Sequence, residues 1–216
     1  MFHMIRVACI SDTHEMHRSI SIPSVDLLLH AGDLTFQGDP EKVIEFNDWC
    51  GSLIVGGIAK QIMCIAGNHD FLFQNHPEKA ASLITKAVYL EDSSYSFSGL
   101  RIHGTPWQPW FYDWAFNLKT EEELKAKFDL MPEDTDILLC HSPPYGVLDR
   151  NLSGRNCGST SLMEAIRRVR PKLVVFGHIH EGYGIVQSDG IVFVNASICT
   201  ANYVPANLPI LVELQT

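Results

Sequence analysis

Seven side chains suited to metal binding follow apolar segments of the sequence. An Asp-x-His pair comes just after residues 5–10 and a His-x-His pair just after residues 173–176, while single Asp, Asn and His residues follow three other apolar segments. In chain order they are Asp12, His14, Asp33, Asn68, His141, His178 and His180. Imidazole nitrogens with carboxylate or amide oxygens and no thiolate favour Mn, Fe, Co, Zn or Ni over calcium, which prefers all-oxygen sites.

Each of these residues alone has an ordinary explanation. Asp12 could cap a turn, His14 could be a surface residue, and His141 could be a buried loop histidine. Five such sites in order, each just after an apolar strand, make coincidence improbable. Seven ligands are too many for one tetrahedral ion, and they predict two ions that share a carboxylate. Such a pair clamps the attacking and leaving oxygens at phosphorus and provides a hydroxide nucleophile at neutral pH.

Two residues beside Asn68 have catalytic potential. His69 is not needed as a ligand, and it could reach the scissile phosphate to protonate the leaving oxygen or to stabilise negative charge. Asp70 could accept the other N–H of the His69 ring and so fix its tautomer. We therefore predict that His69 and Asp70 are the catalytic residues.

The elements that must position these residues predict an α/β protein. Five buried strands precede the ligands, at residues 5–10, 25–29, 61–66, 137–140 and 173–176, and further strands follow at 191–194 and 210–214. In open α/β sheets ligands bind at the carboxyl ends of strands, so the five ends should meet. If the backbone is extended, the side chains of Asp12 and His14 would point to the same side of the chain, and so would those of His178 and His180.

Local signals place the helices and one hairpin. Ser98-Gly99 is typical of a hairpin turn, and residues 80–88 have helical character. Residues 104–111 are too rich in proline for a regular element. Three helix starts are indicated by Asp39 before Pro40, by a capping box of Thr120 and Glu123, and by a second capping box of Ser161 and Glu164.

Size and composition describe one globular domain over residues 1–216. The apolar share is 46% and no apolar run approaches the roughly 20 residues of a membrane helix. Residues 1–4 lead directly into the first strand without a basic and apolar leader, so we expect a cytoplasmic protein. The six cysteines lie far apart, and disulfides are not expected in a reducing cytosol.

The charge balance bears on the partners. The chain has 25 acidic and 16 basic residues and a net charge of −9, which argues against an extended nucleic-acid surface because such a surface needs clustered Lys and Arg. An acidic protein can still bind phosphate when metal ions supply the positive charge. We expect a small substrate and no membrane partner, and the oligomeric state is open.

The motif series resembles the signature of the calcineurin-like metallophosphoesterases. The matching residues are Asp12-x-His14, Gly32-Asp33, Gly67-Asn68-His69-Asp70, His141 and Gly177-His178-x-His180. Longer stretches at 104–111, 176–184 and 194–200 resemble the brain-type metallophosphoesterase-domain-containing branch and its microbial relatives. The chain departs from the common Gly-Asp-x-x-Asp/Asn motif at Phe36, a position that is not normally a ligand.

The resemblance implies a two-sheet β-sandwich flanked by helices, in αββα order, and a bridging role for Asp33. It implies one metal site of Asp12, His14, Asp33 and His180, and a second of Asp33, Asn68, His141 and His178. It also makes His69 the catalytic histidine. Two divalent transition-metal ions are implied, with Mn as the first candidate and Fe, Co, Zn or Ni as others.

We expect a metal-dependent phosphodiesterase that acts on small phosphodiesters, with 2′,3′- and 3′,5′-cyclic nucleotides among the candidates. A nuclease or nucleotide pyrophosphatase on the same site is one alternative, and a catalytically silent scaffold of the same fold is another. Arg150 and Arg155 could contact a substrate phosphate or lie in a solvated loop. Trp107 and Trp110, with the two aromatic residues that follow, could stack on a base or pack a loop onto the core.

Overall fold

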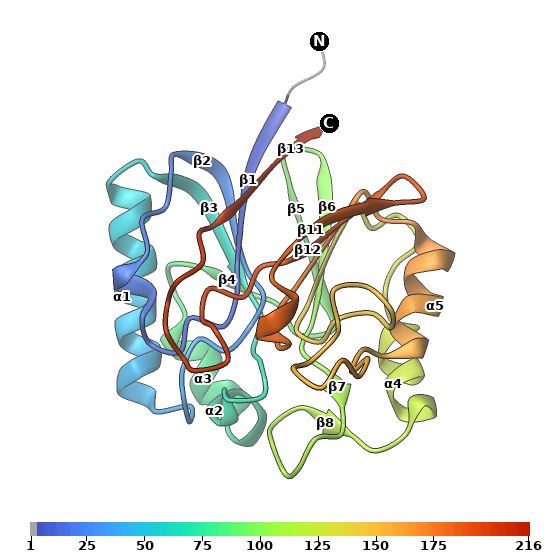
Figure 1. The fold of residues 1–216 in the computed structure, drawn as a ribbon. Coiled ribbons are helices and arrows are strands. Elements are labelled where there is room, and N and C mark those ends of the chain that lie inside the picture. The colour runs from blue at the N-terminus through green and yellow to red at the C-terminus, as the bar shows by residue number, and fades with distance from the viewer. Residues whose placement is uncertain (1–3) are drawn as a thin grey trace.

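The protein is a sandwich of two β-sheets with helices on both outer faces, as the computed structural model of residues 4–216 shows (Figure 1). The first sheet has the order β13-β1-β2-β3-β4, with strands Ile210–Gln215, Met4–Ile10, Val25–His30, Ala59–Cys64 and Val88–Tyr89. The second has the order β11-β12-β10-β9-β6-β5, with strands Gly184–Ser188, Ile191–Asn195, Leu173–Phe176, Ile137–Cys140, Leu100–Thr105 and Ser93–Phe97. A small third sheet pairs β7 (Gln108–Pro109) with β8 (Asn117–Leu118).

The alternation of side chains along the strands builds three apolar layers. Leu27 and Leu29 of β2 face the second sheet, where they join Val175 of β10 in the central core. Leu28, which lies between them, faces the opposite way and packs in the layer that contains Phe46. A third layer covers the outer face of the second sheet. Period-two burial on both sheets therefore confirms the expected αββα sandwich.

The helices cover the two outer faces. On the first sheet lie α1 (Pro40–Val55), α2 (Phe71–Asn75) and α3 (Pro77–Leu83), and on the second lie α4 (Glu121–Phe128) and α5 (Thr160–Val169) (Figure 1). Two short 3₁₀ turns, η1 (His17–Ser19) and η2 (His180–Gly182), lie in loops. The predicted starts of α1 and α4 are confirmed, since Asp39 accepts from the Glu41 N–H and Thr120 forms the capping box with Glu123.

Three local predictions are wrong. The start of α5 is capped by Ser159, whose hydroxyl accepts from the Leu162 N–H, whereas Ser161 is bound to the carboxylate of Glu121. The helix expected over 80–88 ends at residue 83, because the chain then extends into the edge strand β4. The proline-rich stretch 104–111 contains the end of β6 and the short β7, which pairs with β8.

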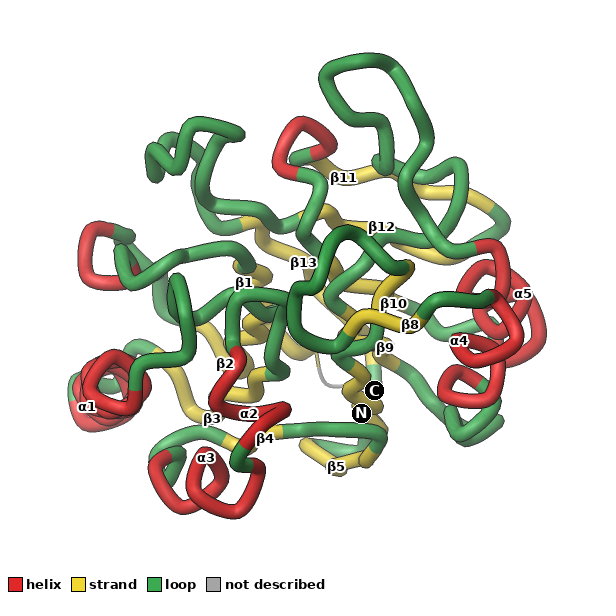
Figure 2. The backbone as a smooth tube through the Cα atoms, turned by 90° about the horizontal axis from the view of Figure 1, so that it is seen from below, coloured by secondary structure: helices red, strands yellow, loops and turns green. Residues whose placement is uncertain are grey.

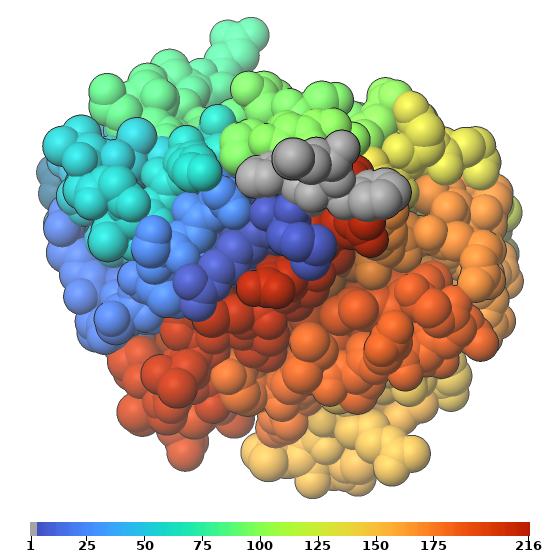
Figure 3. Space-filling model, turned by 90° about the horizontal axis from the view of Figure 1, so that it is seen from above, coloured from blue at the N-terminus to red at the C-terminus, as the bar shows by residue number. Residues whose placement is uncertain are grey.

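Parallel strands bring their carboxyl ends to one end of the molecule. Strands β1, β2 and β3 are parallel neighbours, and so are β6, β9, β10 and β12. A parallel bridge between Ser11 and Ser197 joins the two sheets at this end, where Figure 2 shows the long loops. At the opposite end β1 lies beside the C-terminal strand β13 (Figure 3).

Residues 1–3, for which no basic and apolar leader is expected, lie outside the described residues. Between residues 4 and 216, every helix is too short or too polar to cross a membrane.

The corrected cap of α5 can be tested by two substitutions. We expect Ser159→Ala to lower the free energy of unfolding by about 1 kcal/mol, because it leaves an N-terminal N–H of the helix without its acceptor. Glu164→Ala, on the exposed side of the same helix, should change it by less than about 0.5 kcal/mol. Urea unfolding followed by circular dichroism measures both, and equal losses in the two variants would contradict this cap assignment.

Candidate metal centre

Asp12 lies at the junction of the two sheets, directly after β1. Its carboxylate is fully buried and accepts the His178 N–H at 3.1 and 3.0 Å and the Ser197 hydroxyl at 2.9 Å. The Nε2 atom of His180 lies 3.2 Å from Oδ1. One carboxylate therefore joins the end of the first strand to the loops that follow β10 and β12.

A single carboxylate oxygen of Asp33 faces two imidazole rings. Its Oδ1 accepts the backbone N–H of His69 at 2.9 Å. Its Oδ2 lies 3.8 Å from Nε2 of His14 and 3.5 Å from Nε2 of His141. The position between rings from two different strands is the one that a bridging carboxylate would need.

Asn68 completes the far side of the cluster. Its Oδ1 lies 2.9 Å from Nε2 of His141 and 2.8 Å from Nδ1 of His178. Backbone carbonyls orient two of the rings from behind, since Nδ1 of His141 donates to Ala31 at 2.8 Å and Nδ1 of His180 donates to Thr200 at 2.9 Å. Such outer contacts fix the tautomer and leave Nε2 free as a ligand.

The predicted ligands therefore come together from five strand ends. Among residues 4–216, three sets have ligand atoms within 4.8 Å of one another, namely Asp12 with His14 and His180, His14 with Asp33 and His69, and Asp12 with Asp33 and His141. The second set includes His69, which we had expected to lie beside the ligands without being one. His69 is thus within reach of the same ion as His14, and its role needs a test that separates binding from catalysis.

The donor set fits metal ions. His14 is fully buried, and neither of its ring nitrogens has a hydrogen-bond partner among residues 4–216. Buried polar atoms normally have partners, and this imidazole also lies within ligand distance of Asp12 and Asp33, so its nitrogens are available to a metal ion. In the neutral His141 ring, Nδ1 carries the proton, and the Nε2 lone pair then faces the carbonyl-type oxygen of Asn68. A cation between these electron-rich atoms removes their repulsion.

Burial keeps most of the imidazoles neutral, which is the form that binds metal. It lowers the pKa of His14 and of His178 to about 3 and also lowers the pKa of His141. Burial acts against the charged forms of Asp12 and His180 as well. Their close contact outweighs it, so the pKa of Asp12 is lowered and that of His180 is raised to about 9.

The ligand backbone is turned, not extended. The φ angles of Asp12, His14 and Asp33 are 52°, 42° and 56°, and that of His178 is 66°. These values lie in the left-handed region that residues other than glycine rarely adopt. The period-two explanation for the x-spaced pairs is therefore wrong, although the side chains do converge. Such strained positions cluster at functional sites, where the surrounding structure imposes them.

Three glycines leave room for the ligands. A Cβ at Gly67 would overlap Asp33 Oδ1 and the His141 ring, and one at Gly177 would overlap the Asp12 carboxylate. A Cβ at Gly32 would lie too close to Nδ1 of His141. The glycines that precede Asp33, Asn68 and His178 therefore have a steric purpose, which is the close approach of backbone to ligand.

Asp70 does not orient His69 as we had expected. The Nδ1 atom of His69 lies 2.8 Å from the carbonyl oxygen of Phe36, which fixes the tautomer instead. The buried carboxylate of Asp70 accepts from the N–H groups of Gly67, Leu34 and Thr35, and from the Thr35 hydroxyl. Asp70 thus holds the Asp33 loop against the Asn68 loop, and the predicted contact with the His69 ring is wrong.

Aromatic rings surround the cluster, and sequence reasoning missed two of them, Trp114 and Tyr203. Trp114 stacks on His69 with ring centroids 4.3 Å apart. Phe36 stacks on His14 at 5.1 Å, and the Tyr203 ring meets His14 edge-on at 4.9 Å. Ser197, a partner of Asp12, was also missed, although it belongs to the stretch 194–200 that carries the family resemblance. Tyr203 follows no motif that could have indicated it.

The remaining candidates divide into core and loop residues. Trp107 packs on the core and donates from Nε1 to Asp92 at 2.8 Å, so its role is structural. His17 is buried against Phe46 and Trp49. Arg150 donates to Asn156 at 3.3 Å within its own loop.

Comparisons with known proteins agree with this geometry. A family model described as calcineurin-like phosphoesterase matches residues 5–182. The human protein named metallophosphoesterase domain-containing protein 1 is 42% identical over 98% of this chain and 71% of its own length. A probable cyclic nucleotide phosphodiesterase of Synechococcus sp. is 29% identical over 78% of this chain and 62% of its own.

A solved structure described as a novel archaeal phosphodiesterase superposes with a TM-score of 0.52 at 15% identity, covering 98% of this chain and 100% of that chain. At this identity the similarity concerns the fold alone. It supports the two-sheet architecture independently of the sequence match.

Because Gly67 lies so close to Asp33 and His141, we predict that adding a side chain at this position weakens metal binding although every ligand is kept. We expect Gly67→Ala to at least halve the metal retained after dialysis, because the new methyl group displaces Asp33 and His141. Gly51→Ala is the matched control, since its Cβ meets only the flexible Lys86 side chain and alanine favours the helix. Elemental analysis of the folded variants gives the metal content. Full metal retention by Gly67→Ala would contradict the steric role given to Gly67.

Proposed function

Because the chain belongs to the calcineurin-like phosphoesterase family, we propose that it is a metal-dependent phosphodiesterase of small phosphodiesters, including 2′,3′- or 3′,5′-cyclic nucleotides. The observation that carries the proposal is the carboxylate of Asp33, whose Oδ2 faces the imidazoles of both His14 and His141, the first of them without a hydrogen-bond partner among the described residues. A diester preference is supported by the relative from Synechococcus sp., which is named a probable cyclic nucleotide phosphodiesterase.

The proposed cofactor is a pair of divalent transition-metal ions, with Mn²⁺ the first candidate. One ion would be held by Asp12, His14, Asp33 and His180, and the other by Asp33, Asn68, His141 and His178. When bound, such ions supply positive charge to phosphoryl oxygens and lower the pKa of coordinated water. The mixed nitrogen and oxygen donors, without a thiolate, suit Mn, Fe, Co, Zn or Ni.

His69 supplies the proton that the leaving alcohol needs. Its Nδ1–H donates to the Phe36 carbonyl, so Nε2 is the nitrogen available to substrate. In the protonated ring the Nε2–H is donated to the oxygen of the breaking P–O bond, and the alcohol leaves neutral. Asp70 acts indirectly, because its four accepted hydrogen bonds fix the loops that carry Asp33 and His69.

The alternatives have less support. A polynucleotide substrate for a nuclease is disfavoured by the net charge of −9, although a nucleotide pyrophosphatase would use the same groups. A silent scaffold would not need the complete ligand set, which this chain keeps together with His69. We also propose a cytoplasmic location, in line with six free cysteines, five of which are buried.

His69→Ala separates catalysis from metal binding. We expect kcat on a 3′,5′-cyclic nucleotide, whose alkoxide leaving group needs a proton, to fall by roughly 10²- to 10⁴-fold, the usual contribution of a general acid, with unchanged metal content. His76→Ala, an exposed histidine nearby, is the control and should retain full activity. If His69→Ala loses metal, then His69 is a ligand and the role given to it here is wrong.

Metal dependence and ester preference test the reaction itself. We expect chelation to abolish hydrolysis and Mn²⁺ to restore it, with kcat/KM at least tenfold higher for bis(p-nitrophenyl) phosphate than for p-nitrophenyl phosphate. A panel of Mn, Fe, Co, Ni, Zn and Mg measures the first effect. Activity on monoesters alone, or cleavage of single-stranded DNA in preference to the diester, would overturn the proposal.

A further inference from the structure

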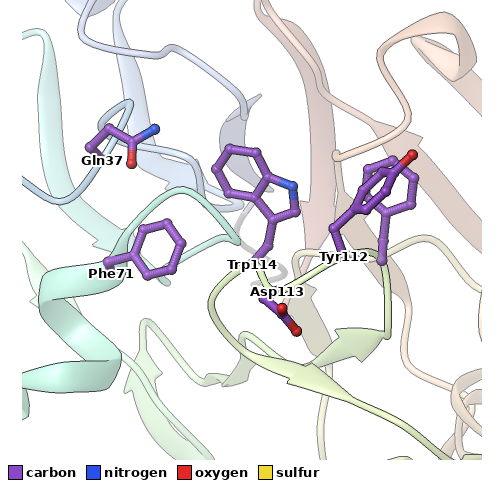
Figure 4. A pocket seen from close by; sticks show the side chains of 6 residues that line it. Gln37, Phe71, Tyr112, Asp113 and Trp114 are labelled. Carbon is purple, nitrogen blue, oxygen red and sulfur yellow. The ribbon is translucent and has the colours of Figure 1, made fainter.

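A pocket of about 560 Å³ (Figure 4) adjoins the metal centre, because its lining residue Trp114 contacts the ring of His69. One wall is formed by Gln37 and by Phe71 at the start of α2, and the other by the loop residues Phe111, Tyr112, Asp113 and Trp114. The two walls come from segments that are far apart in sequence. The volume lies within the range of small-molecule sites, and four of the six lining residues are aromatic.

The pocket begins where the catalytic site ends. Trp114 is a lining residue, and its ring also stacks on His69 at 4.3 Å. On the same side Phe71 lies 5.9 Å from Trp114, with the two ring planes 34° apart. A group attached to the oxygen that His69 protonates would therefore meet Trp114 next.

The loop that carries these aromatic rings is fixed at its base. The Ala115 N–H donates to the carbonyl of Asn68 at 3.0 Å, and the Phe116 N–H donates to the side chain of Gln74 at 2.9 Å. The side-chain amide of Asn117 holds the tip from inside, with bonds to the carbonyls of Phe111 and Tyr112. The loop is thus tied to the segment that supplies Asn68 and His69.

The rings of Phe111 and Tyr112 are not packed in the hydrophobic core. Phe111 is 53% exposed and Tyr112 is 66% exposed, and they contact each other with centroids 4.6 Å apart. Trp107, in the same stretch of sequence, is by contrast packed on the core. Exposed aromatic rings on an anchored loop, open to a pocket beside the reaction centre, suit a ligand with a flat apolar face.

We propose that this pocket binds a planar ring on the leaving alcohol and so selects phosphodiesters of aryl alcohols or nucleosides. The inference rests on the proposed function, and it adds the substrate class and the residues that recognise it. Stacking on Tyr112 and Phe111 would favour any flat ring, and the carboxylate of Asp113 would disfavour rings with negative charge. The base of a nucleoside and a synthetic aryl group share this chemistry.

The kinetic test compares a ring-bearing diester with a ring-free one. For the double variant Phe111→Ala/Tyr112→Ala we expect KM for bis(p-nitrophenyl) phosphate to rise about tenfold with little change in kcat, in line with the loss of stacking. Both constants for bis(2-chloroethyl) phosphate, followed by ³¹P NMR, should stay unchanged. Tyr95→Ala, an aromatic residue of β5 that is 41% exposed, is the control and should alter neither substrate.

A binding test does not depend on turnover. By calorimetry on the metal-loaded protein we expect phenyl phosphate and a nucleoside 5′-monophosphate to bind about tenfold more tightly than methyl phosphate, and the double variant to lose this preference. Preference for only one of the two ring-bearing ligands would identify the source of the ring.

The two proposals fail in different ways. A wild-type protein that hydrolyses no diester refutes the proposed function, and the calorimetric preference for rings then still decides the role of the pocket. Equal effects of the double variant on both diesters, or an unchanged preference for phenyl over methyl phosphate, would overturn the pocket assignment. Circular dichroism of the double variant confirms its fold, since both side chains are exposed.

Discussion

The structure depends on one buried carboxylate, that of Asp12. A charge without solvent is costly unless it is paired and hydrogen-bonded, and Asp12 meets this need with a backbone N–H, a hydroxyl and an imidazole. These partners come from residues 178–197, at the far end of the sequence. The same interaction closes the sandwich and aligns the groups that would hold metal, so the fold and the site cannot vary independently.

The strands could be predicted, and so could the set of residues that their carboxyl ends bring together, because both leave local signals. Short apolar runs end in polar residues at the carboxyl edge, and β9 and β10 match their predicted bounds. The conformation of the site could not be predicted in the same way. The left-handed backbone of Asp12 and His178 is imposed by contacts between the sheets, and these contacts link residues more than 160 positions apart.

Errors in the finer predictions have a common physical origin. Ser161 fits the pattern of a helix cap, and Asp70 fits the pattern of a partner for the adjacent His69 ring. In both cases the side chain instead forms hydrogen bonds with groups that are distant in sequence. Glu121 of α4 binds Ser161, while N–H groups of the Asp33 loop occupy Asp70. The aromatic residues Trp114 and Tyr203 were missed for the opposite reason, because they contact the site only through the folding of distant loops.

The pairing of β1 with β13 has a consequence for the use of this protein as a scaffold. Met4 lies opposite Gln215, so the two ends of the described chain meet at the end of the molecule remote from the ligand loops. A short connecting peptide could therefore join them, and circular permutation is best tolerated where termini are close together. Fusion partners or surface tethers attached at this end would leave the opening beside His69 accessible to small molecules.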